Sequence, residues 1–225
     1  MPVNGFYLSQ VQRLQGSLTR MGELAGRLVA DSVAAFVSRD LILAREVIER
    51  DLELNRLEDE HEELAIQIIA LNQPVARDLR LLIAYLRINT AIEGVGDLAV
   101  NIAQSAVRIA DRPTIRPYVD IPRTYELVRD MWDDSMRCFV NMDERLAAEL
   151  RDRDDKIDKA NQETIVQLIQ ISTEVPAQIY QATNFIGVSK NLERIGDLAV
   201  DIADEVVYAQ RGELRHARTA QRFTA

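Results

Sequence analysis

The sequence predicts an all-α protein built from two tandem, pseudo-repeated three-helix bundles, with six long helices in total. Apolar or small residues recur at spacings of three and four, as along Leu28, Ser32, Ala35 and Phe36, which is typical of amphipathic helices. The alternation of β-branched and aromatic residues that is typical of strands is missing. Prolines, which lack a backbone donor and interrupt helices, divide the chain into long segments.

The proline positions set the expected boundaries. The six prolines are Pro2, Pro74, Pro113, Pro117, Pro122 and Pro176. Helices are predicted at residues 8–38, 40–72, 74–110, 122–145, 147–174 and 176–210. The expected organisation is a first three-helix repeat at 1–111, a Pro-rich linker at 112–122, a second three-helix repeat at 123–210 and a polar tail at 211–225.

An internal repeat supports this division. An offset of 100 residues aligns Glu93 with Glu193 and matches five consecutive residues, GDLAV at 96–100 and at 196–200. Further upstream the offset becomes 103, which aligns Phe36 with Phe139. The difference falls near the turns that hold Pro74 and Pro176, where changes of length are tolerated.

Composition limits the classes of partner and the compartment. The chain has 36 acidic and 27 basic residues and a formal charge of -9, so we expect no binding to nucleic acid, which is itself negative. No stretch approaches the ~20 apolar residues of a membrane helix, and a signal peptide is missing, so we expect a cytoplasmic protein without direct membrane insertion. The single cysteine, Cys138, is expected to be buried.

Two of the predicted helices carry a row of polar residues at four-residue intervals, which places each row on one helix face. In helix 74–110 the row is Asn89, Glu93, Asp97 and Asn101. In helix 176–210 the row is Ser189, Glu193, Asp197 and Asp201. Like charges at this spacing repel, and no basic residue is inserted along the second row. We therefore expect a cationic partner to face these rows.

A second acidic pair lies on the preceding helix of each half, Asp51 with Asn55 and Asp154 with Asp158. If the two helices of each half pack side by side, both pairs meet in one patch. Carboxylate oxygens without histidine suit Mg²⁺, Mn²⁺ or iron, with zinc as a further candidate. A single pair of this kind is more simply a solvated helix face, but duplication in the same register favours metal binding.

Two segments then resemble a known family. The run NLERIGD at 191–197 looks like the repeated signature of the PhoU family, accessory proteins of phosphate-specific transport. The run QPVARDLR at 73–80 resembles the turn before the third helix of that family. The resemblance covers the chain from about Leu18 to Tyr208.

The resemblance implies a function as well as a fold. Family members are non-enzymatic negative regulators of the phosphate response, which contact the ATPase subunit of the phosphate ABC importer and a membrane sensor histidine kinase, and they are often homodimers. Such partners would hold a cytoplasmic protein at the inner face of the membrane. Carried over position by position, the implied metal ligands are Asp51, Asn55, Glu93, Asp97, Asp154, Asp158, Glu193 and Asp197, with Asn101 and Asp201 as additional metal or partner contacts.

Two departures from the family pattern stand in the first half. Gly94 and Val95 occupy the positions of Arg194 and Ile195, and Asn55 stands where aspartate is usual. An asparagine offers a carbonyl oxygen but no charge. A metal site in the first half should therefore be weaker than its counterpart in the second.

Two other functions compete with regulation. One is a generic helical interaction module without a regulatory role. The other is a di-iron oxidoreductase, because Glu58 and His61 form one Glu-x-x-His motif. The repeat positions are Asn161 and Thr164, so the second motif is absent, and His216 lies in the tail. The enzyme hypothesis is therefore the weaker one.

Overall fold

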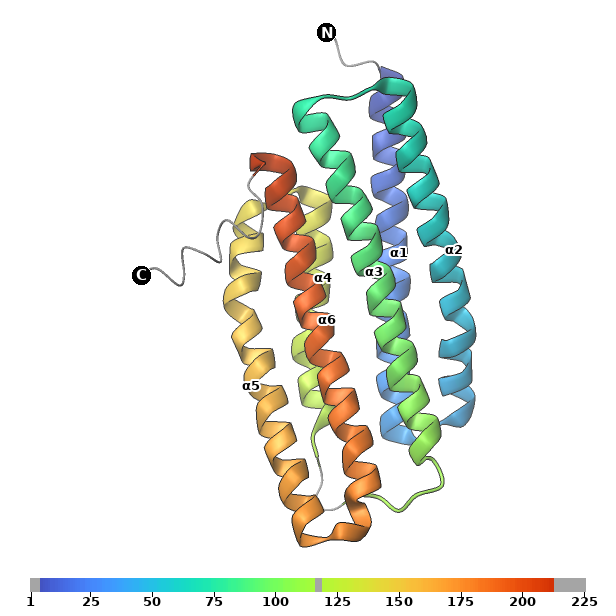
Figure 1. Ribbon diagram of the computed structural model, residues 1–225, viewed down its shortest axis with the longest axis vertical. Coiled ribbons are helices and arrows are strands. Elements are labelled where there is room, and N and C mark those ends of the chain that lie inside the picture. Colours follow the sequence, from blue (N-terminus) through green and yellow to red (C-terminus); the bar gives the residue numbers. More distant parts are fainter. Residues whose placement is uncertain (1–4, 116–118, 213–225) are drawn as a thin grey trace.

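The computed structural model describes residues 5–115 and 119–212, and within them it forms helices and no strand (Figure 1). The helices are α1 (Gly5–Ser38), α2 (Leu41–Asn72), α3 (Ala76–Ile109), α4 (Ile121–Asn141), α5 (Glu144–Glu174), the short 3-10 helix η1 (Pro176–Gln178) and α6 (Ile179–Arg211). The prediction of an all-α fold with six long helices is confirmed. Pro2, Pro117, His216 and most of the predicted tail lie outside the described residues.

The helices form two three-helix groups that lie side by side (Figure 1). Each helix of α1, α2 and α3 packs against the other two, and α4, α5 and α6 repeat this arrangement. The most extensive packing between the groups joins α3 to α6, and α1 also contacts α4. In consequence, α2 and α5 form the two outer edges of the molecule.

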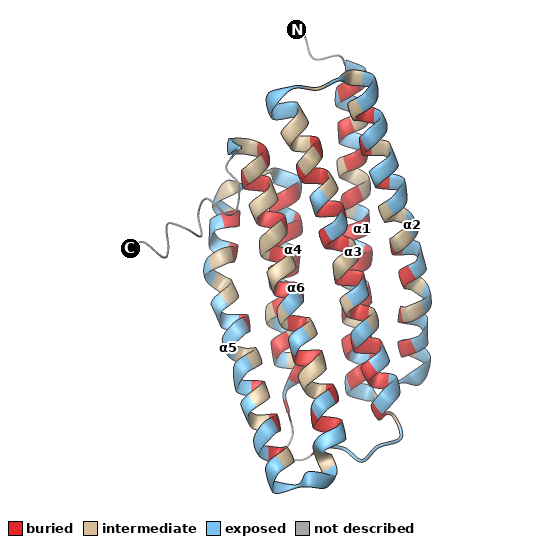
Figure 2. Cartoon of the chain, viewed as in Figure 1, coloured by how far each residue is buried: buried red, intermediate tan, exposed pale blue. Residues whose placement is uncertain are grey.

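One apolar core runs through both groups. Phe36 of α1 packs edge to face on Phe185 of α6, with ring centroids 4.7 Å apart, and Tyr85 of α3 does the same on Phe139 of α4 at 5.3 Å. The side chain of Trp132 reaches α1 and donates a hydrogen bond to the carbonyl of Gly22. Figure 2 shows that the buried residues of α3 and α6 face this shared interior. The two groups therefore depend on each other for burial.

The boundary between α4 and α5 differs from the sequence-based expectation. The fourth helix ends at Asn141 rather than 145, because Met142 turns into the left-handed region with φ 50°. Asp143 then caps α5, since its carboxylate accepts hydrogen bonds from the backbone N–H groups of Arg145 (2.9 Å) and Leu146 (3.2 Å). Asp40, its repeat counterpart, caps α2 in the same way.

The α3–α4 and α5–α6 connections also show local detail that the proline positions did not predict. Pro176 begins the short helix η1, and α6 starts at Ile179 rather than at 176. In the α3–α4 connection, Ile115 and Val119 are buried against the core. Cys138 is fully buried, as expected. None of the described helices combines the length and the apolar character that crossing a membrane requires.

Candidate functional site

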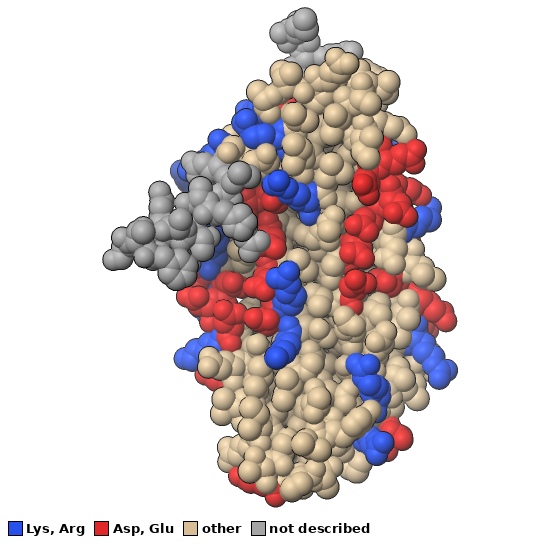
Figure 3. Space-filling view, viewed as in Figure 1, with Lys and Arg blue, Asp and Glu red and all other residues tan. Residues whose placement is uncertain are grey.

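The acidic residues gather in two places, one at the α2–α3 seam and one at the α5–α6 seam. The first acidic cluster consists of Asp51, Asn55, Glu58, Glu93 and Asp97, and the second acidic cluster of Asp154, Asp158, Glu193 and Asp197. Figure 3 shows acidic patches on both sides of one face of the molecule, with basic side chains between them. Helix α2 packs against α3, and α5 packs against α6, so the two acidic pairs of each half lie along the same seam.

In the first cluster, Asp51 is the most buried acidic group. Its side chain is 7% exposed, and its Oδ1 atom has no hydrogen-bond partner among the described residues. Burial raises its pKa, the nearby charge of Asp97 raises it further, and the amide of Asn55 partly offsets both effects. Asn55 also has a buried oxygen without a partner in the described part of the chain. Two oxygen donors therefore point into the seam without a hydrogen bond.

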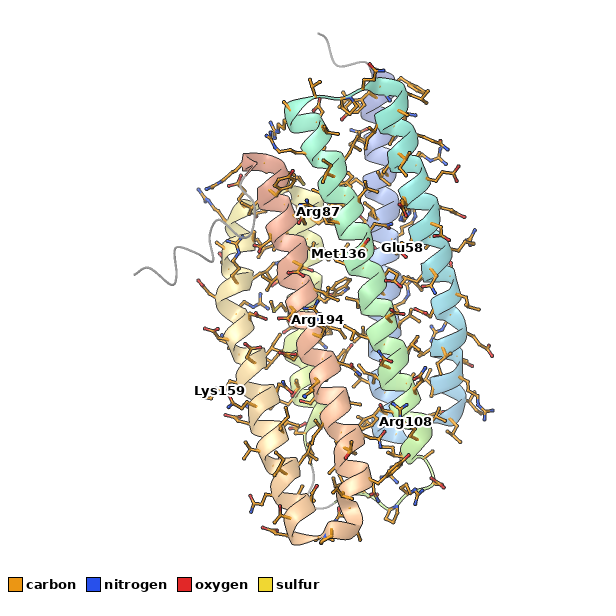
Figure 4. All side chains as sticks on the ribbon, viewed as in Figure 1. Glu58, Arg87, Arg108, Met136, Lys159 and Arg194 are labelled. Atoms are coloured by element: carbon orange, nitrogen blue, oxygen red, sulfur yellow. The ribbon has the colours of Figure 1, made fainter. Side chains whose placement is uncertain are left out.

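Glu93 shows the largest effect in this cluster. Burial, followed by the charges of Asp97, Glu58 and Asp51, raises the pKa of Glu93 to about 7. Glu58 was not among the expected ligands, yet its own pKa is raised by burial and by Asp59, Glu62 and Asp97. Figure 4 places Glu58 between α2 and α3. Its spacing from Asp51, seven residues along α2, could have indicated that it shares the same helix face.

The second cluster repeats this pattern, with the carboxylate of Asp158 at the position where the first cluster has the amide of Asn55. Asp154 has a buried Oδ1 atom without a hydrogen-bond partner among the described residues. Burial, followed by the charges of Asp158 and Asp197, raises the pKa of Asp154 to about 6. Burial and Asp197 also raise the pKa values of Asp158 and Glu193. The same mutual repulsion therefore acts in both halves.

One basic side chain reaches the second cluster from a position next to the row of acidic residues. The guanidinium of Arg194 lies 3.0 Å from Oδ2 of Asp197, one helical turn away. Both side chains are partly exposed, so the pair contributes little to stability. In the first cluster the corresponding position is Gly94, which has no charge.

Glycines open the space that the buried carboxylates occupy. A Cβ atom on Gly96 would lie 2.2 Å from Leu54 Cδ2 and 2.7 Å from Asp51 Oδ1. The counterpart in the second half, Gly196, has more room, because its nearest neighbour would be Ile157 Cδ1 at 3.0 Å. Close helix packing therefore surrounds both of these glycines. At Gly187, in contrast, nothing lies within 4 Å of an added Cβ atom.

Comparison with known proteins identifies the family. The sequence profile of the PhoU domain matches this chain twice, at residues 18–106 and 121–206. This chain belongs to the PhoU family. The two matches correspond to the two three-helix groups, and the resemblance carried by the NLERIGD segment is confirmed.

Several PhoU proteins are similar along nearly their whole length. A phosphate-specific transport system accessory protein PhoU homolog from Caulobacter vibrioides is 34% identical, with 92% of this chain and 90% of that protein covered. The homolog from Pseudomonas putida is 32% identical over 92% of this chain and 82% of its own length. The crystal structure of PhoU from Pseudomonas aeruginosa superposes with a TM-score of 0.88 at 30% identity, over 92% of this chain and all of that one.

The donor chemistry of this PhoU chain fits a metal ion, although the side chains are not closed around one. Each cluster offers carboxylate oxygens, and Asp51 and Asp154 each have a buried oxygen that lacks a partner among the described residues. In residues 5–115 and 119–212, no three His, Cys, Asp or Glu side chains lie close enough together to enclose an ion. Binding would therefore require the exposed members, such as Asp97, to turn inward.

The Glu-x-x-His motif has a structural explanation. His61 is buried, and burial lowers its pKa. Both ring nitrogens are occupied, Nδ1 by Asn89 Oδ1 at 3.0 Å and Nε2 by Ser17 Oγ at 2.7 Å. Asn89 also donates to the carbonyl of Glu58 at 2.9 Å, so this residue of the polar row serves helix packing. A free imidazole ligand for a di-iron centre is not available in this arrangement.

The far ends of the two polar rows differ from each other. Asn101 is exposed one turn beyond Asp97 on α3. Asp201 is half-buried one turn beyond Asp197, and its charge contributes to the raised pKa of Glu205. At the near end, the hydroxyl of Ser189 donates a hydrogen bond to Asn161 Oδ1 at 2.7 Å across the α5–α6 seam. The clusters are thus centred on the middle of each row.

The raised pKa of Glu93 makes stability depend on pH. Folding raises this pKa from 4.5 to about 7, so the folded protein retains a proton that the unfolded chain has lost. The contribution of Glu93 to stability is therefore largest below about pH 4.5 and is lost as the pH rises through about 7. Between about pH 5 and pH 8 we expect metal-free protein to lose about 1 kcal/mol from this group, a value reduced for solvent screening. Glu93→Gln should remove most of that loss.

Chemical denaturation in the presence of a chelator, repeated across this pH range, measures the effect. The matched control is Glu149→Gln on the exposed side of α5, which should follow the wild-type curve. Parallel pH curves for the wild type and Glu93→Gln would show that Glu93 carries no such penalty.

Proposed function

We propose that this protein is a non-enzymatic negative regulator of phosphate uptake and of the phosphate-starvation response. The observation that carries the proposal is its similarity, over 92% of the chain, to proteins named as accessory to phosphate-specific transport. The expected partners are the ATPase subunit of the phosphate ABC importer and its sensor histidine kinase. Both would be met in the cytoplasm, with the protein held at the inner face of the membrane by these partners.

The architecture supports a role in holding partners. Six helices expose long, charged outer surfaces, and the buried polar groups His61 and Asn89 are used in packing rather than left free for chemistry. We further propose that the two acidic clusters bind metal ions, of which iron, Mn, Mg and Zn are all candidates. Neutralising the clusters would remove the carboxylate repulsion along both seams.

Deletion of the gene in a strain with a reporter of a phosphate-starvation promoter tests the regulatory proposal. In phosphate-rich medium the reporter should switch on in the deletion strain and switch off again when the wild-type gene is restored. A silent reporter in the deletion strain would favour the alternative of a helical interaction module without a regulatory role. Affinity purification from cells grown with and without phosphate should recover the importer ATPase subunit.

A further inference from the structure

A groove of about 540 Å³ lies between α1 and α4, where the two three-helix groups meet. Its walls come from these two helices, and its floor reaches Ile195 of α6, which is 1% exposed. Because α6 forms the floor, the groove opens on the side of the molecule that is turned away from the viewer in Figure 1. It is therefore separate from both acidic clusters, which lie at the α2–α3 and α5–α6 seams.

Small residues on the α1 wall leave room for large side chains from α4. A Cβ atom on Gly22 would lie 2.3 Å from Met136 Cε, and a Cβ atom on Gly26 would lie 3.0 Å from Trp132 Nε1. The indole N–H of Trp132 donates to the carbonyl of Gly22 at 3.2 Å, which fixes the orientation of the ring. Trp132 is 4% exposed, so it forms the back of the groove rather than its rim.

The two walls differ although the repeat relates their helices. At the offset of 103 residues, Gly22 corresponds to Tyr125, Gly26 to Arg129 and Val29 to Trp132. All six residues line the groove. The aromatic rings therefore lie on the α4 wall alone, and they face glycine and valine on the α1 wall.

The size and the lining of the groove fit a small, largely apolar ligand. Pockets that bind small molecules have volumes of about 300–1,000 Å³ and are lined mainly by apolar and aromatic side chains with a few polar groups. Tyr125 and Trp132 supply aromatic contacts, and the thioether of Met136 adds sulfur–aromatic contacts.

Two arginines flank one end of the groove, Arg27 from α1 and Arg129 from α4. Burial raises the pKa of Tyr125, the charge of Arg129 opposes this rise, and Asp31 of α1 adds to it. Arg129 and Asp31 therefore lie near the same tyrosine. Arg27 is one turn before Asp31 on α1, so both guanidinium groups belong to this end.

Neither arginine is neutralised inside the groove. In the part of the chain that the structure describes, the side chain of Arg27 makes no ion pair or hydrogen bond. Arg129 pairs with its neighbour Asp130 at 2.8 Å, and both of these side chains are at least half exposed. An exposed pair of this kind is weak, so Arg129 remains available to an anion.

The acidic residues of the lining do not favour a cationic ligand. Burial raises the pKa of Asp133, while the charges of Arg129 and Arg137, one turn away on either side, act in the opposite direction. Glu23 is next to Gly22, one turn before Arg27. With three arginines and two acidic residues, the lining has a positive balance in a chain of formal charge -9.

We propose that the α1–α4 groove binds a small ligand with a flat apolar body and a single anionic group. The body lies against Trp132 and Met136, and the anionic group lies between Arg27 and Arg129, where charge-assisted hydrogen bonds hold it. A helix of a partner protein is the other possible occupant. Such a helix is ~10–12 Å across, so it would cover a groove of this volume rather than fill it.

The inference goes beyond the proposed function, which assigns no small organic ligand to this chain. The two can also fail separately. Ligand binding is measured on the purified protein, whereas the reporter strain measures regulation in the cell.

A pair of naphthalene probes tests the groove. Anilinonaphthalene sulfonate carries one negative charge, and N-phenylnaphthylamine is its neutral counterpart with the same rings. The chain has one tryptophan, Trp132, so its emission reports on this groove. Titration with the sulfonate should quench Trp132 to saturation at one probe per chain. The neutral probe should bind about 10-fold more weakly, because it cannot use the arginines.

Two variants separate the charged end of the groove from its apolar body. Arg27→Glu with Arg129→Glu should raise the dissociation constant of the sulfonate by about 10-fold or more and leave that of the neutral probe unchanged. Ala30→Leu places a larger side chain in the groove and should weaken the binding of both probes.

The matched control for charge is Arg145→Glu with Lys159→Glu, two exposed positions on α5 that give the same change in net charge. This variant should bind both probes as the wild type does, and circular dichroism checks that every variant is folded. Three results would each overturn the proposal. They are probe fluorescence that rises without quenching of Trp132, equal loss of both probes in the arginine variant, and no binding of either probe. The last result would leave a partner helix as the occupant.

Discussion

Replacing Gly96 with alanine should lower the free energy of unfolding by about 1–3 kcal/mol, although alanine is the better helix former. The added methyl group would lie 2.2 Å from Leu54 Cδ2, and Leu54 is fully buried. It would also lie 2.7 Å from Asp51 Oδ1 and would push that carboxylate out of the seam. Thermal or chemical unfolding at constant pH measures the change.

Two other glycines provide matched comparisons. Gly196→Ala should be close to neutral, because its nearest neighbour is 3.0 Å away and can shift slightly, which offsets the gain in helix propensity. Gly187→Ala should stabilise the protein by roughly 0.5–1 kcal/mol, because nothing lies within 4 Å of the new methyl group. If all three variants were equally stable, the close approach of α3 to α2 at Gly96 would be wrong.

The double substitution Glu193→Ala with Asp197→Ala should lower the metal affinity of the second cluster by about 100-fold or more. The double substitution removes both α6 carboxylates and leaves only Asp154 and Asp158. Metal content of protein purified without chelators, followed by titration with Mn²⁺, measures the loss. Affinity should also fall as the pH drops through about 6, where Asp154 takes up a proton.

The first cluster provides the internal comparison. The double variant Glu93→Ala with Asp97→Ala should lose less bound metal than the double variant of the second cluster. The reason is that Asn55 supplies no charge where the second cluster has Asp158. Glu149→Ala with Asp152→Ala, two exposed positions on α5, is the matched control and should bind as the wild type does. Equal metal content in all four proteins would remove the metal sites from the proposed function.

Much of the fold was predictable because the period of an α-helix is visible in the local spacing of apolar residues. Spacings of three and four gave the six helices, and prolines gave most of their limits. The end of α4 was missed because the cap at Asp143 depends on a backbone turn at Met142. The repeat also brought out the four acidic pairs, since residues four apart must share a helix face.

The clusters themselves were only partly predictable. Glu58 joins the first cluster, and Arg194 reaches Asp197, because of how the side chains are directed in the seams. The roles of Asn89 and His61 as packing partners could not be read from either helix alone. These contacts join residues that are far apart in the sequence.

The sequence by itself determined the helical class, the duplication, the family and the residues of the acidic rows, because all of these depend on local spacing and on residue identity. The tertiary structure decided which carboxylate oxygens are buried without a hydrogen-bond partner in the described part of the chain, and why Gly96 must be small. The physical reason is that desolvation and charge repulsion depend on distances between helices. Those distances arise only when the two three-helix groups pack around one core.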